Sequence, residues 1–544
     1  MELEQIQIGD KLVSPYTIPS GIVMTSPACA TRLLEVIPEL GFWTTKSIGL
    51  EPRVGYREPI LHQVEDGTWI NAVGLTNPGC FEFGEELART KIPKDKAVLC
   101  SIFGKDAREF VKVAKTLEDY VDAFELNLSC PHATGYGMQL GQDPEAVNII
   151  TYDVVHAVKR PVYVKLTPKA INIDQIAKIA IQAGAKGIVA INTEPGLSHM
   201  VNGTYVLSNR FGGLSGAAIR QIGTRCVRQV REAIGSIPLI IAMGGIDSSD
   251  AISEYVYAGA NAIGIGSFFA GMNEQEIQNA FSIGRKDLEQ GTNYLSCFKK
   301  RVSTKYFQTR IEQVVNQGCD FKIAITNSRL NRAGPGQFVF AYIPGVGEKP
   351  FSIMDNNPLT LGIQTRGEFT RAFNTLKEGE SFYVRGPYGQ SLNVPEGSRI
   401  HLVGGGCGIA GLLFLAKKFS KNSVVMNILG AKDKMHLPYL EEFEKYGNTF
   451  AATDDGSLGA KGTIADLLNA INKCGSNFMN GDYFFNCGPR AMVDAVLPLE
   501  LQVSSADRIY SSLDYLTKCG VGLCGSCVDN KGKRTCVEGP FMKL

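Results

Sequence analysis

The feature that most constrains the fold is a regular alternation of two hydrophobic patterns across about the first 270 residues. Short apolar runs rich in β-branched and aromatic residues recur eight times, and the stretches between them place apolar residues three and four positions apart, as amphipathic helices do. Eight strand and helix units in sequence predict an α/β protein of the TIM barrel type. The predicted strands are 22–25, 42–45, 98–103, 123–128, 162–166, 187–191, 238–243 and 262–265, and the helices between them include 107–117, 145–158, 174–183 and 217–234.

Polar and glycine residues follow these predicted strands, where a barrel places its chemistry. The glycine pair Gly244 and Gly245 follows the seventh strand, and Gly266 and Ser267 follow the eighth. Barrels often bind a phosphate on backbone N–H groups at these two positions, so we expect a phosphate-bearing ligand. Ordinary turn glycines are the alternative.

Cys130 lies on a polar, glycine-rich stretch directly beyond the fourth predicted strand. A buried structural cysteine would normally lie inside an apolar run. A thiol on an exposed loop can act as a general base where its surroundings favour the thiolate. The position therefore indicates a catalytic role, with an inert cysteine as the alternative.

The composition excludes several classes of protein. The 55 basic and 54 acidic residues leave a net charge of +1, so we expect no nucleic-acid partner. The N-terminal sequence has no apolar core, and no run of 18 apolar residues could span a bilayer, so we expect a cytoplasmic protein without a membrane partner. The 14 cysteines then suggest metal or catalytic roles rather than disulfides.

The second half of the chain has a different pattern. Short strands with Gly and Pro turns extend from about residue 295 to 395, which predicts a small antiparallel barrel, and alternating strands and helices follow from 399 to about 501, which predicts an open α/β sheet. We therefore divide the chain into four parts at 1–292, 293–397, 398–504 and 505–544.

The last part contains the most specific motif, KCGVGLCGSCVDNKGKRTC. Its cysteines have the spacing C-x4-C-x2-C-x8-C, and the first three match plant-type ferredoxins, in which four thiolates bind a [2Fe–2S] cluster. Zinc sites more often show two short cysteine pairs. The sequence therefore predicts an iron–sulfur cluster on Cys519, Cys524, Cys527 and Cys536.

A glycine-rich turn follows the predicted strand 400–403 and precedes a helical pattern. The sequence GGGCGIAG contains G-x-G-x-x-G in the strand–turn–helix context of a dinucleotide site. Asp433 stands where a ribose-binding acid would, but lysines flank it, so NAD and NADP both remain open. A later NCGP marks another strand end where a nicotinamide could lie. The candidate NAD(H)-binding residues are Gly405, Gly406, Gly408, Cys487 and Gly488.

Several strings of the first half resemble class 1 dihydroorotate dehydrogenases and the related dihydropyrimidine dehydrogenases. They are TTKSIGLEPR, NAVGLTNPG, ELNLSCPH, VKLTP, INT, GGLSG, MGGI and IGIGS, in the family's order. The resemblance implies a bound FMN. Its implied ligands are Ser26, Lys46, Ser47, Asn127, Lys165, Ile191, Gly216, Gly244, Gly245, Gly266 and Ser267.

The same resemblance implies Cys130 as catalytic base and Lys165 as the cation that stabilises the reduced flavin. Amide side chains offer both donors and acceptors to a flat, polar pyrimidine. The implied substrate residues are Lys46, Asn71, Ala72, Val73, Gly74, Leu75, Asn127, Asn192 and Thr193.

Two positions depart from the usual family pattern. His132 stands where many members have Asn, and it matches the dihydropyrimidine dehydrogenase string, while Ser101 replaces an asparagine on the FMN side. These differences leave the identity of the pyrimidine open. An NAD(P)H-dependent reductase of uracil, thymine or orotate is therefore the main alternative, and a redox module that only docks FMN is a third.

The second half contains KPFSIMD, TRGEFT and VRGPYG and resembles the ferredoxin-reductase-like electron-transfer subunit of type B dihydroorotate dehydrogenases. This likeness implies FAD. The family usually has Arg at position 349. Lys349 keeps the positive charge but lacks the planar guanidinium group. The family also often has Pro at the position of Gly411. The implied FAD residues are Lys349, Pro350, Phe351, Ser352, Gly367 and Thr370.

The two resemblances together indicate a catalytic subunit fused to its electron-transfer subunit. A hydride carries two electrons, an iron–sulfur cluster carries one, and NAD+ accepts only a hydride, so a second flavin must convert between them. The expected order is dihydroorotate, FMN, [2Fe–2S], FAD and NAD+. By analogy with the barrel family we also expect a homodimer through the barrel domain.

Overall fold

The computed structural model describes residues 3–128, 140–170, 172–300, 302–473, 478 and 481–544. The chain divides into two compact units. Unit 1 comprises residues 1–305 and 521–533, and unit 2 comprises residues 306–520 and 534–544. The four-part division predicted from the sequence is finer than this one and stays a prediction.

Unit 1 is built on an eight-stranded parallel sheet with the strand order β3-β16-β15-β10-β9-β8-β7-β4. The two outer strands approach each other through a parallel bridge between Tyr16 and Leu40, and the N–H of Gly41 donates to the carbonyl of Tyr16 at 2.9 Å. The sheet therefore curves into a near-closed barrel, which confirms the predicted class. The strands are β3 (Tyr16–Thr17), β4 (Phe42–Thr44), β7 (Ala97–Ile102), β8 (Ala123–Asn127), β9 (Val162–Leu166), β10 (Gly187–Ala190), β15 (Leu239–Met243) and β16 (Ala262–Gly264).

The prediction of a first strand at 22–25 is wrong. The first barrel strand is β3, which pairs with β16, and residues 22–25 form a buried turn. Val23 has a φ of 57°, a left-handed backbone conformation that an extended strand cannot contain. The apolar run is buried all the same, since Val23 and Met24 are both inaccessible to solvent. A buried loop can therefore have the same apolar composition as a buried strand.

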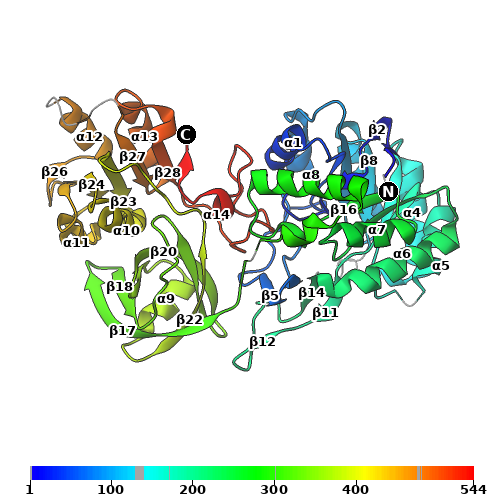
Figure 1. Cartoon of the computed structure of the whole chain (residues 1–544), viewed down its shortest axis with the longest axis horizontal. Helices are drawn as coiled ribbons and strands as arrows, with labels where there is room; N and C mark the ends of the chain where they lie inside the picture. Colours follow the sequence, from blue (N-terminus) through cyan, green and yellow to red (C-terminus); the bar gives the residue numbers. More distant parts are fainter. Residues whose placement is uncertain (1–2, 129–139, 171, 301, 474–477, 479–480) are drawn as a thin grey trace. The chain divides into compact units, whose positions relative to one another are not determined.

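Helices follow the strands and lie around the outside of the barrel (Figure 1). Their apolar faces pack inward, as in α3, where Phe110, Val113 and Leu117 are buried. The helices are α1 (Pro27–Val36), α2 (Cys80–Ala88), α3 (Ala107–Leu117), α4 (Pro144–Ala157), α5 (Ile173–Gln182), α6 (Arg220–Ile234), α7 (Ser249–Tyr257) and α8 (Glu274–Gln290).

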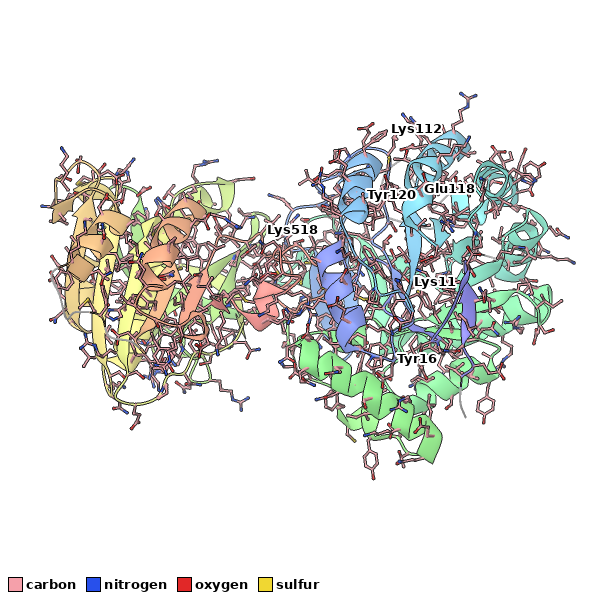
Figure 2. The ribbon with its side chains drawn as sticks, turned by 90° about the horizontal axis from the view of Figure 1, so that it is seen from above. Lys11, Tyr16, Lys112, Glu118, Tyr120 and Lys518 are labelled. Atoms are coloured by element: carbon pink, nitrogen blue, oxygen red, sulfur yellow. The ribbon has the colours of Figure 1, made fainter. Side chains whose placement is uncertain are left out.

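A short hairpin of β1 (Ile6–Ile8) and β2 (Lys11–Val13) closes the N-terminal end of the barrel. Its side chains Ile6, Ile8 and Val13 join a core cluster with Ala123 and Tyr163 of the barrel strands. Lys11, labelled in Figure 2, donates to Asp122 Oδ2 at 3.0 Å. Because this end is filled with apolar side chains, the opposite, carboxyl end is the one left for chemistry.

A smaller antiparallel sheet of unit 1 has the strand order β11-β14-β6-β5. Strand β14 pairs with β6 so that Gly213 lies opposite Asn71 and Gly216 lies opposite Thr68. Two stretches that the sequence predicts to bind substrate and flavin are thereby neighbours in one sheet. The strands are β5 (Leu61–Glu65), β6 (Thr68–Asn71), β11 (Glu194–Leu197) and β14 (Gly212–Gly216), with a separate hairpin of β12 (Met200–Val201) and β13 (Thr204–Tyr205).

Unit 2 begins with a closed antiparallel barrel in the order β17-β18-β21-β20-β19-β22. Phe369 and Phe373 of helix α9 (Glu368–Thr375) belong to the same core cluster as Val339, Leu361 and the other inward side chains. This confirms the antiparallel barrel expected from the short strands and turns. Its strands are β17 (Phe307–Gln317), β18 (Phe321–Thr326), β19 (Phe338–Ile343), β20 (Gly347–Asn356), β21 (Leu359–Gln364) and β22 (Ser381–Tyr388).

The rest of unit 2 is a mixed α/β sheet in the order β26-β25-β24-β23-β27-β28-β29, parallel except for β29. Strands β28 and β29 come from the stretch that the sequence analysis assigned to the cluster segment. The strands are β23 (Arg399–Gly405), β24 (Val424–Ala431), β25 (Asn448–Thr453), β26 (Ala460–Lys461), β27 (Tyr483–Cys487), β28 (Ile509–Ser512) and β29 (Met542–Lys543), and the helices are α10 (Ile409–Phe419), α11 (Leu440–Glu444), α12 (Ile464–Lys473), α13 (Arg490–Glu500) and α14 (Thr535–Glu538).

Segment 521–533 belongs to unit 1 and packs on the turn before α1. The N–H of Val23 donates to the Leu523 carbonyl at 2.9 Å, and the N–H of Gly271 donates to the Val521 carbonyl at 2.8 Å. An ideal Cβ on Gly525 would lie 1.6 Å from Thr25 Oγ1, so a side chain there would collide with that turn. Among the described residues, no helix is both long enough and apolar enough to cross a membrane.

Candidate active site

A lysine and a glutamate are buried inside the barrel of unit 1. Side chains alternate along a strand, so Glu125 on β8 shares the inward face of Ala123, and Lys165 on β9 shares that of Tyr163. Lys165 Nζ lies 3.6 Å from Glu125 Oε1, and both side chains are nearly inaccessible to solvent. Glu125 lies one step deeper than Asn127, toward the apolar end of the barrel.

Hydrogen bonds extend from this pair to the carboxyl end of the strands. Ser101 Oγ donates to Glu125 Oε1 at 2.8 Å, and the hydroxyls of Ser101 and Ser47 lie 2.9 Å apart. Asn127 Nδ2 donates to Ser47 Oγ at 2.9 Å, and Asn127 Oδ1 accepts from Asn192 Nδ2 at 3.3 Å. The structure thus brings together side chains from five barrel strands or the loops after them, including four predicted site residues.

This network holds a cation and several amide groups in fixed positions. An ammonium has three donors, and the 3.6 Å contact with Glu125 is longer than a hydrogen bond. Glu125 Oε2 is buried and has no hydrogen-bond partner among the described residues. The arrangement suits a polar ligand that accepts from Lys165, because the protein has oriented the donor in advance.

Other predicted substrate residues lie on the small sheet and on the loop beyond it. Asn71 ends β6, and its Nδ2 donates to the Gly213 carbonyl at 3.2 Å. Leu75 has a φ of 55°. After β10, Asn192 Oδ1 accepts from the N–H of Thr193 at 2.9 Å. Ala72, Val73 and Gly74 complete the loop, of which Ala72 is buried, and half-buried Lys46 follows β4.

Three of the predicted flavin residues line one small cavity of about 20 Å³. They are Gly216, Gly245 and Ser267, from β14 and from the loops after β15 and β16. An ideal Cβ on Gly216 would lie 1.9 Å from the Gly67 carbonyl oxygen, so only glycine allows this approach. The cavity is where the sequence predicts the FMN phosphate.

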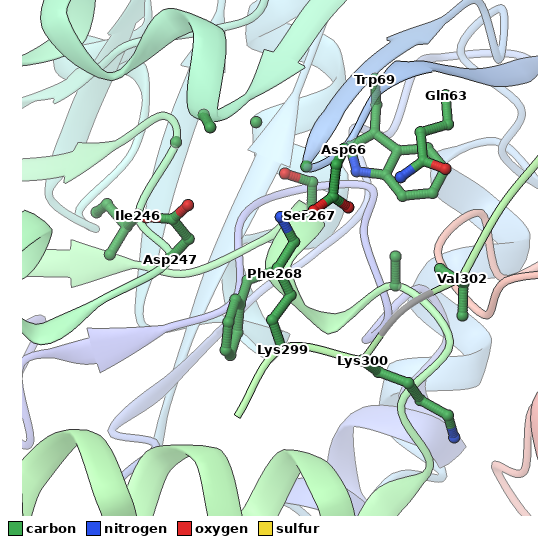
Figure 3. A pocket seen from close by; sticks show the side chains of 15 residues that line it. Gln63, Asp66, Trp69, Ile246, Asp247, Ser267, Phe268, Lys299, Lys300 and Val302 are labelled. Carbon is green, nitrogen blue, oxygen red and sulfur yellow. Dashed lines mark ion pairs between the residues drawn. The ribbon is translucent and has the colours of Figure 1, made fainter. Parts of the chain in front are cut away.

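Lys299 also lines this cavity, and the sequence analysis missed it. It belongs to the segment after α8, and its Nζ lies 3.4 Å from Asp66 Oδ2. In Figure 3 the side chain of Lys299 extends toward Asp66 and Ser267, whereas that of Lys300 points away. Lys300 is engaged by Glu276 at 2.9 Å. A cation at this place adds to the backbone donors that a phosphate would use.

The remaining predicted flavin residues lie close to the same strand ends. Ser26 is the N-cap of α1, where its hydroxyl accepts from the N–H of Cys29 at 3.3 Å. Ile191 is buried after β10, and the Gly244 carbonyl accepts from the Tyr255 hydroxyl at 2.6 Å. Gly266 directly precedes Ser267. Cys130 and His132 lie outside the described residues, so the role of Cys130 stays a prediction.

The predicted FAD residues of unit 2 lie on two elements of the antiparallel barrel. Lys349, Pro350, Phe351 and Ser352 are consecutive on β20, and Phe351 contacts the rings of Phe369 and Phe373. Gly367 is the N-cap of α9, and Thr370 Oγ1 accepts from its N–H at 2.9 Å. An ideal Cβ on Gly411 would lie 3.1 Å from Ser352 Oγ, so helix α10, which follows the glycine-rich turn, packs closely on β20.

A larger cavity of about 550 Å³ lies at the carboxyl ends of the parallel strands in unit 2. Gly405 and Gly406 line it, with Lys432, Asp454 and Thr463. Gly408 packs on the Cys487 carbonyl, because an ideal Cβ there would lie 2.3 Å from that oxygen. Cys487 ends β27 beside Gly404 of β23, and Gly488 follows it. Such a crevice at strand ends is where open α/β sheets bind dinucleotides.

The four cysteines of the C-terminal motif are all buried. Cys524 and Cys527 belong to unit 1, and Cys519 and Cys536 belong to unit 2. The [2Fe–2S] cluster on these four cysteines stays a prediction from their spacing. The Cys519 carbonyl accepts from Arg385 at 2.9 Å, an unpredicted contact.

Arg385 is itself fully buried on β22 and forms a two-point ion pair with Glu348 of β20. Its Nη2 lies 2.6 Å from Glu348 Oε1 and its Nε lies 2.7 Å from Oε2. Burial would disfavour the charge, but Glu348 and the Tyr388 hydroxyl beside it keep the pKa of Arg385 well above its usual value. The guanidinium also stacks 3.8 Å from the Phe340 ring centroid.

These features define a catalytic α/β barrel joined to a second unit with a dinucleotide-type crevice. A family model described as dihydroorotate dehydrogenase matches residues 2–279, just over half of the chain. The chain belongs to the dihydroorotate dehydrogenase family.

Its relatives include archaeal proteins named "Dihydroorotate dehydrogenase B (NAD(+)), catalytic subunit". The protein of Methanocaldococcus jannaschii is 42% identical over 267 residues, which are 48% of this chain and 84% of the relative. That of Methanocella arvoryzae is 43% identical over 263 residues, with the same coverages. A solved structure of an NADH-dependent reduced ferredoxin-NADP oxidoreductase covers 43% of this chain and 87% of its own, with 27% identity and a TM-score of 0.39, too low to bear on the fold.

Proposed function

We propose that this chain oxidises dihydroorotate to orotate and passes the electrons to NAD+ within one polypeptide. In this proposal FMN held at the carboxyl end of the barrel would supply hydride uptake from the substrate, a [2Fe–2S] cluster on the four C-terminal cysteines would supply single-electron transfer, and FAD held on β20 would supply hydride transfer to NAD+. The observation that carries the proposal is the buried Lys165 network at the carboxyl end of the barrel, in a chain whose relatives are dihydroorotate dehydrogenases.

The residues of the barrel divide among three tasks. Lys165 presents a cation inside the barrel, where it would stabilise negative charge on a bound ligand, and it pairs with Glu125, which Ser101 holds in place. Asn127 and Asn192 supply amide donors and acceptors to the imide edge of a pyrimidine. Cys130, just beyond β8, is the proposed base that removes a proton from the substrate.

The contacts of segment 521–533 support electron transfer from the barrel to the cluster. Gly525, between the proposed ligands Cys524 and Cys527, packs directly on Thr25, and Thr25 precedes the proposed flavin residue Ser26. The carbonyl of Leu523, next to Cys524, accepts a hydrogen bond from the N–H of Val23 in the same turn. The chain thus places proposed cluster ligands and a proposed flavin ligand on two segments in contact.

Unit 2 supplies the proposed sites for the other two cofactors. Ser352 of the FAD motif lies beside Gly411 of helix α10, and Cys487 Sγ lies 3.3 Å from an ideal Cβ on Gly411. The 550 Å³ cavity adjoins the same glycine-rich turn. The proposed flavin site on β20 and the proposed dinucleotide site in this cavity therefore both adjoin that turn.

An anaerobic substrate panel tests the proposal. The purified protein is mixed with dihydroorotate, orotate, uracil or thymine, and flavin absorbance and NADH are followed. Bleaching by dihydroorotate and NADH formation on adding NAD+ are the expected results. Uracil reduction by NADH without any turnover of dihydroorotate or orotate would contradict the proposal and favour the pyrimidine reductase.

Substitution of Cys130 distinguishes flavin reduction by dihydroorotate from flavin reduction by NADH. Cys130→Ser should slow bleaching by dihydroorotate by at least about a hundredfold, the usual contribution of a general base. Bleaching of the flavins by NADH should be unchanged, because the base acts only on the pyrimidine. Equal losses at both ends would instead indicate a structural role for Cys130.

A further inference from the structure

Three potential metal ligands of different types meet at the edge of the large cavity in unit 2. Cys319 and Asp320 lie in the turn between β17 and β18, and His436 ends the short helix η7 (Lys434–His436). Cys319 Sγ lies 3.2 Å from His436 Nε2 and 3.8 Å from Asp320 Oδ1. All three ligand atoms lie within 4.8 Å of one another.

These distances suit a tetrahedral ion. Zn²⁺ binds thiolate sulfur at about 2.3 Å and imidazole nitrogen at about 2.0–2.1 Å, so a tetrahedral angle separates the two donors by about 3.6 Å. The observed separations of 3.2 and 3.8 Å lie on either side of that value. Three protein ligands leave a fourth position for water.

Neighbouring side chains orient the ligands. His436 Nδ1 lies 2.7 Å from Asp433 Oδ1, which leaves Nε2 for the Cys319 side. A carboxylate on the far nitrogen is the arrangement that orients metal-bound histidines in proteins. Asp320 Oδ2 accepts from Gln364 Nε2 at 2.9 Å, and its other oxygen is the one near Cys319.

The backbone also holds the two contributing segments together. The N–H of Cys319 donates to the Met435 carbonyl at 3.3 Å. An ideal Cβ on Gly318 would lie 2.0 Å from that same oxygen, and Gly318 has a φ of +62°. A side chain at 318 would push the turn away from η7. The close approach of the ligands therefore depends on the fold and not only on long side chains.

We propose that Cys319, Asp320 and His436 form a binding site for a divalent ion of the zinc class. Asp320 and His436 also line the 550 Å³ cavity, which gives the ion a path from solvent. A bound ion would tie the turn of the antiparallel barrel to η7 of the parallel sheet. The assignment does not depend on the proposed function, because it requires neither substrate nor dinucleotide.

The test is a Zn²⁺ titration of the full-length protein loaded with flavins and iron, by equilibrium dialysis with metal analysis. We expect one zinc equivalent above the loaded protein's own metal content. Cys319→Ala and His436→Gln should each weaken its binding by at least about a hundredfold. Asp433→Asn, which removes only the orienting carboxylate, should weaken it by about 10- to 100-fold.

Cys297→Ala is the matched control, because Cys297 is also exposed and its Sγ lies 3.8 Å from the Ser296 hydroxyl, away from the proposed ligands. It should leave zinc binding unchanged. Alkylation followed by peptide mass spectrometry is a second readout, in which Zn²⁺ should protect Cys319 but not Cys297. Unchanged zinc affinity in the Cys319→Ala/His436→Gln double variant, or alkylation of Cys319 at the same rate with zinc, would overturn the proposal.

Discussion

Each unit buries a basic side chain against a glutamate, and the two pairs are built differently. In unit 1, Lys165 and Glu125 are 3.6 Å apart, and Glu125 keeps an oxygen without a hydrogen-bond partner among the described residues. In unit 2, Arg385 meets Glu348 through two contacts of 2.6 and 2.7 Å and also donates to the Tyr388 hydroxyl and the Cys519 carbonyl.

The difference indicates that the Lys165–Glu125 pair can take part in ligand binding, whereas the Arg385–Glu348 pair stabilises the fold. A buried charge costs several kcal/mol unless it is paired and hydrogen-bonded. Arg385 meets this condition entirely within the protein, because at least four of its five N–H groups have acceptors. Lys165 meets it only in part, so a ligand can complete its hydrogen bonds.

The largest effect is expected from Arg385→Met. The substitution leaves Glu348 buried without its cation, which should lower the free energy of unfolding by about 3–5 kcal/mol. The Cys519 carbonyl also loses its donor, so iron content should fall with it. Thermal unfolding and iron analysis measure the two effects.

The double variant Arg385→Met/Glu348→Met tests whether the charge is the cause. Removing both partners should restore much of the stability that the single variant loses, because no unpaired charge remains. A double variant as unstable as the sum of the two singles would show that packing, rather than the unpaired carboxylate, explains the loss.

Another buried glutamate, Glu500 at the end of α13, has an amide beside it but no cation among the described residues. Asn486 Nδ2 donates to its Oε2 at 2.8 Å, and burial raises the pKa of Glu500 to about 7 from an ordinary 4.5. The folded protein thus keeps a proton that the unfolded chain loses, so stability should fall as the pH rises from about 4.5 to about 7.

Glu500→Gln should remove this pH dependence of stability, because an amide does not titrate. The amide oxygen of the glutamine can still accept the hydrogen bond from Asn486. At pH 8 we expect the variant to be more stable than the parent by up to about 3 kcal/mol, and at pH 4.5 nearly equal to it. Thermal melting of both proteins across this range measures the difference. An equal gain at every pH would mean that the carboxyl does not titrate in this window.

The sequence predicts correctly those elements whose hydrophobic periodicity matches their burial in the folded protein. The seven barrel strands β4, β7, β8, β9, β10, β15 and β16 are almost entirely buried and largely apolar, and the sequence predicts α3 at its observed bounds. The turn at Val23 has the same composition, and only its backbone angle distinguishes it. Composition alone therefore cannot separate a buried turn from a short strand.

The site residues that the sequence analysis missed lack a local signal or have an ambiguous one. Glu125 is an acid inside an apolar strand two positions before Asn127, so strand alternation could have placed it on the same face. Lys299 lies far along the chain from the glycines it accompanies, and only the folded path of the segment after α8 brings it to the cavity. Arg385 lies in the string VRGPYG, which carries the resemblance to the electron-transfer subunit but implies no role for the arginine itself.

Lys165→Met tests the ion pair with the longer contact, Lys165 with Glu125. Loss of one preorganised electrostatic donor should slow flavin bleaching by substrate by about 10²- to 10³-fold. The melting temperature should fall less than in Arg385→Met, because the Lys165 contact is long and Glu125 still accepts from Ser101. NADH-driven reduction of an artificial acceptor is the control and should be unchanged. A loss of stability as large as that of Arg385→Met would remove the distinction between the pairs.

The smallest effect is expected at Lys299, whose partner Asp66 is mostly exposed. If Lys299 faces the FMN phosphate, Lys299→Gln should weaken FMN binding by about tenfold, within the range of a charge-assisted hydrogen bond. Riboflavin, which has no phosphate, should bind the parent and the variant equally. Lys300→Gln is the matched control, because Lys300 pairs with Glu276 and its side chain extends away from Asp66 and Ser267. Fluorescence titration of the deflavinated protein gives the affinities, and equal weakening of FMN and riboflavin would show that Lys299 acts through packing and not through the phosphate.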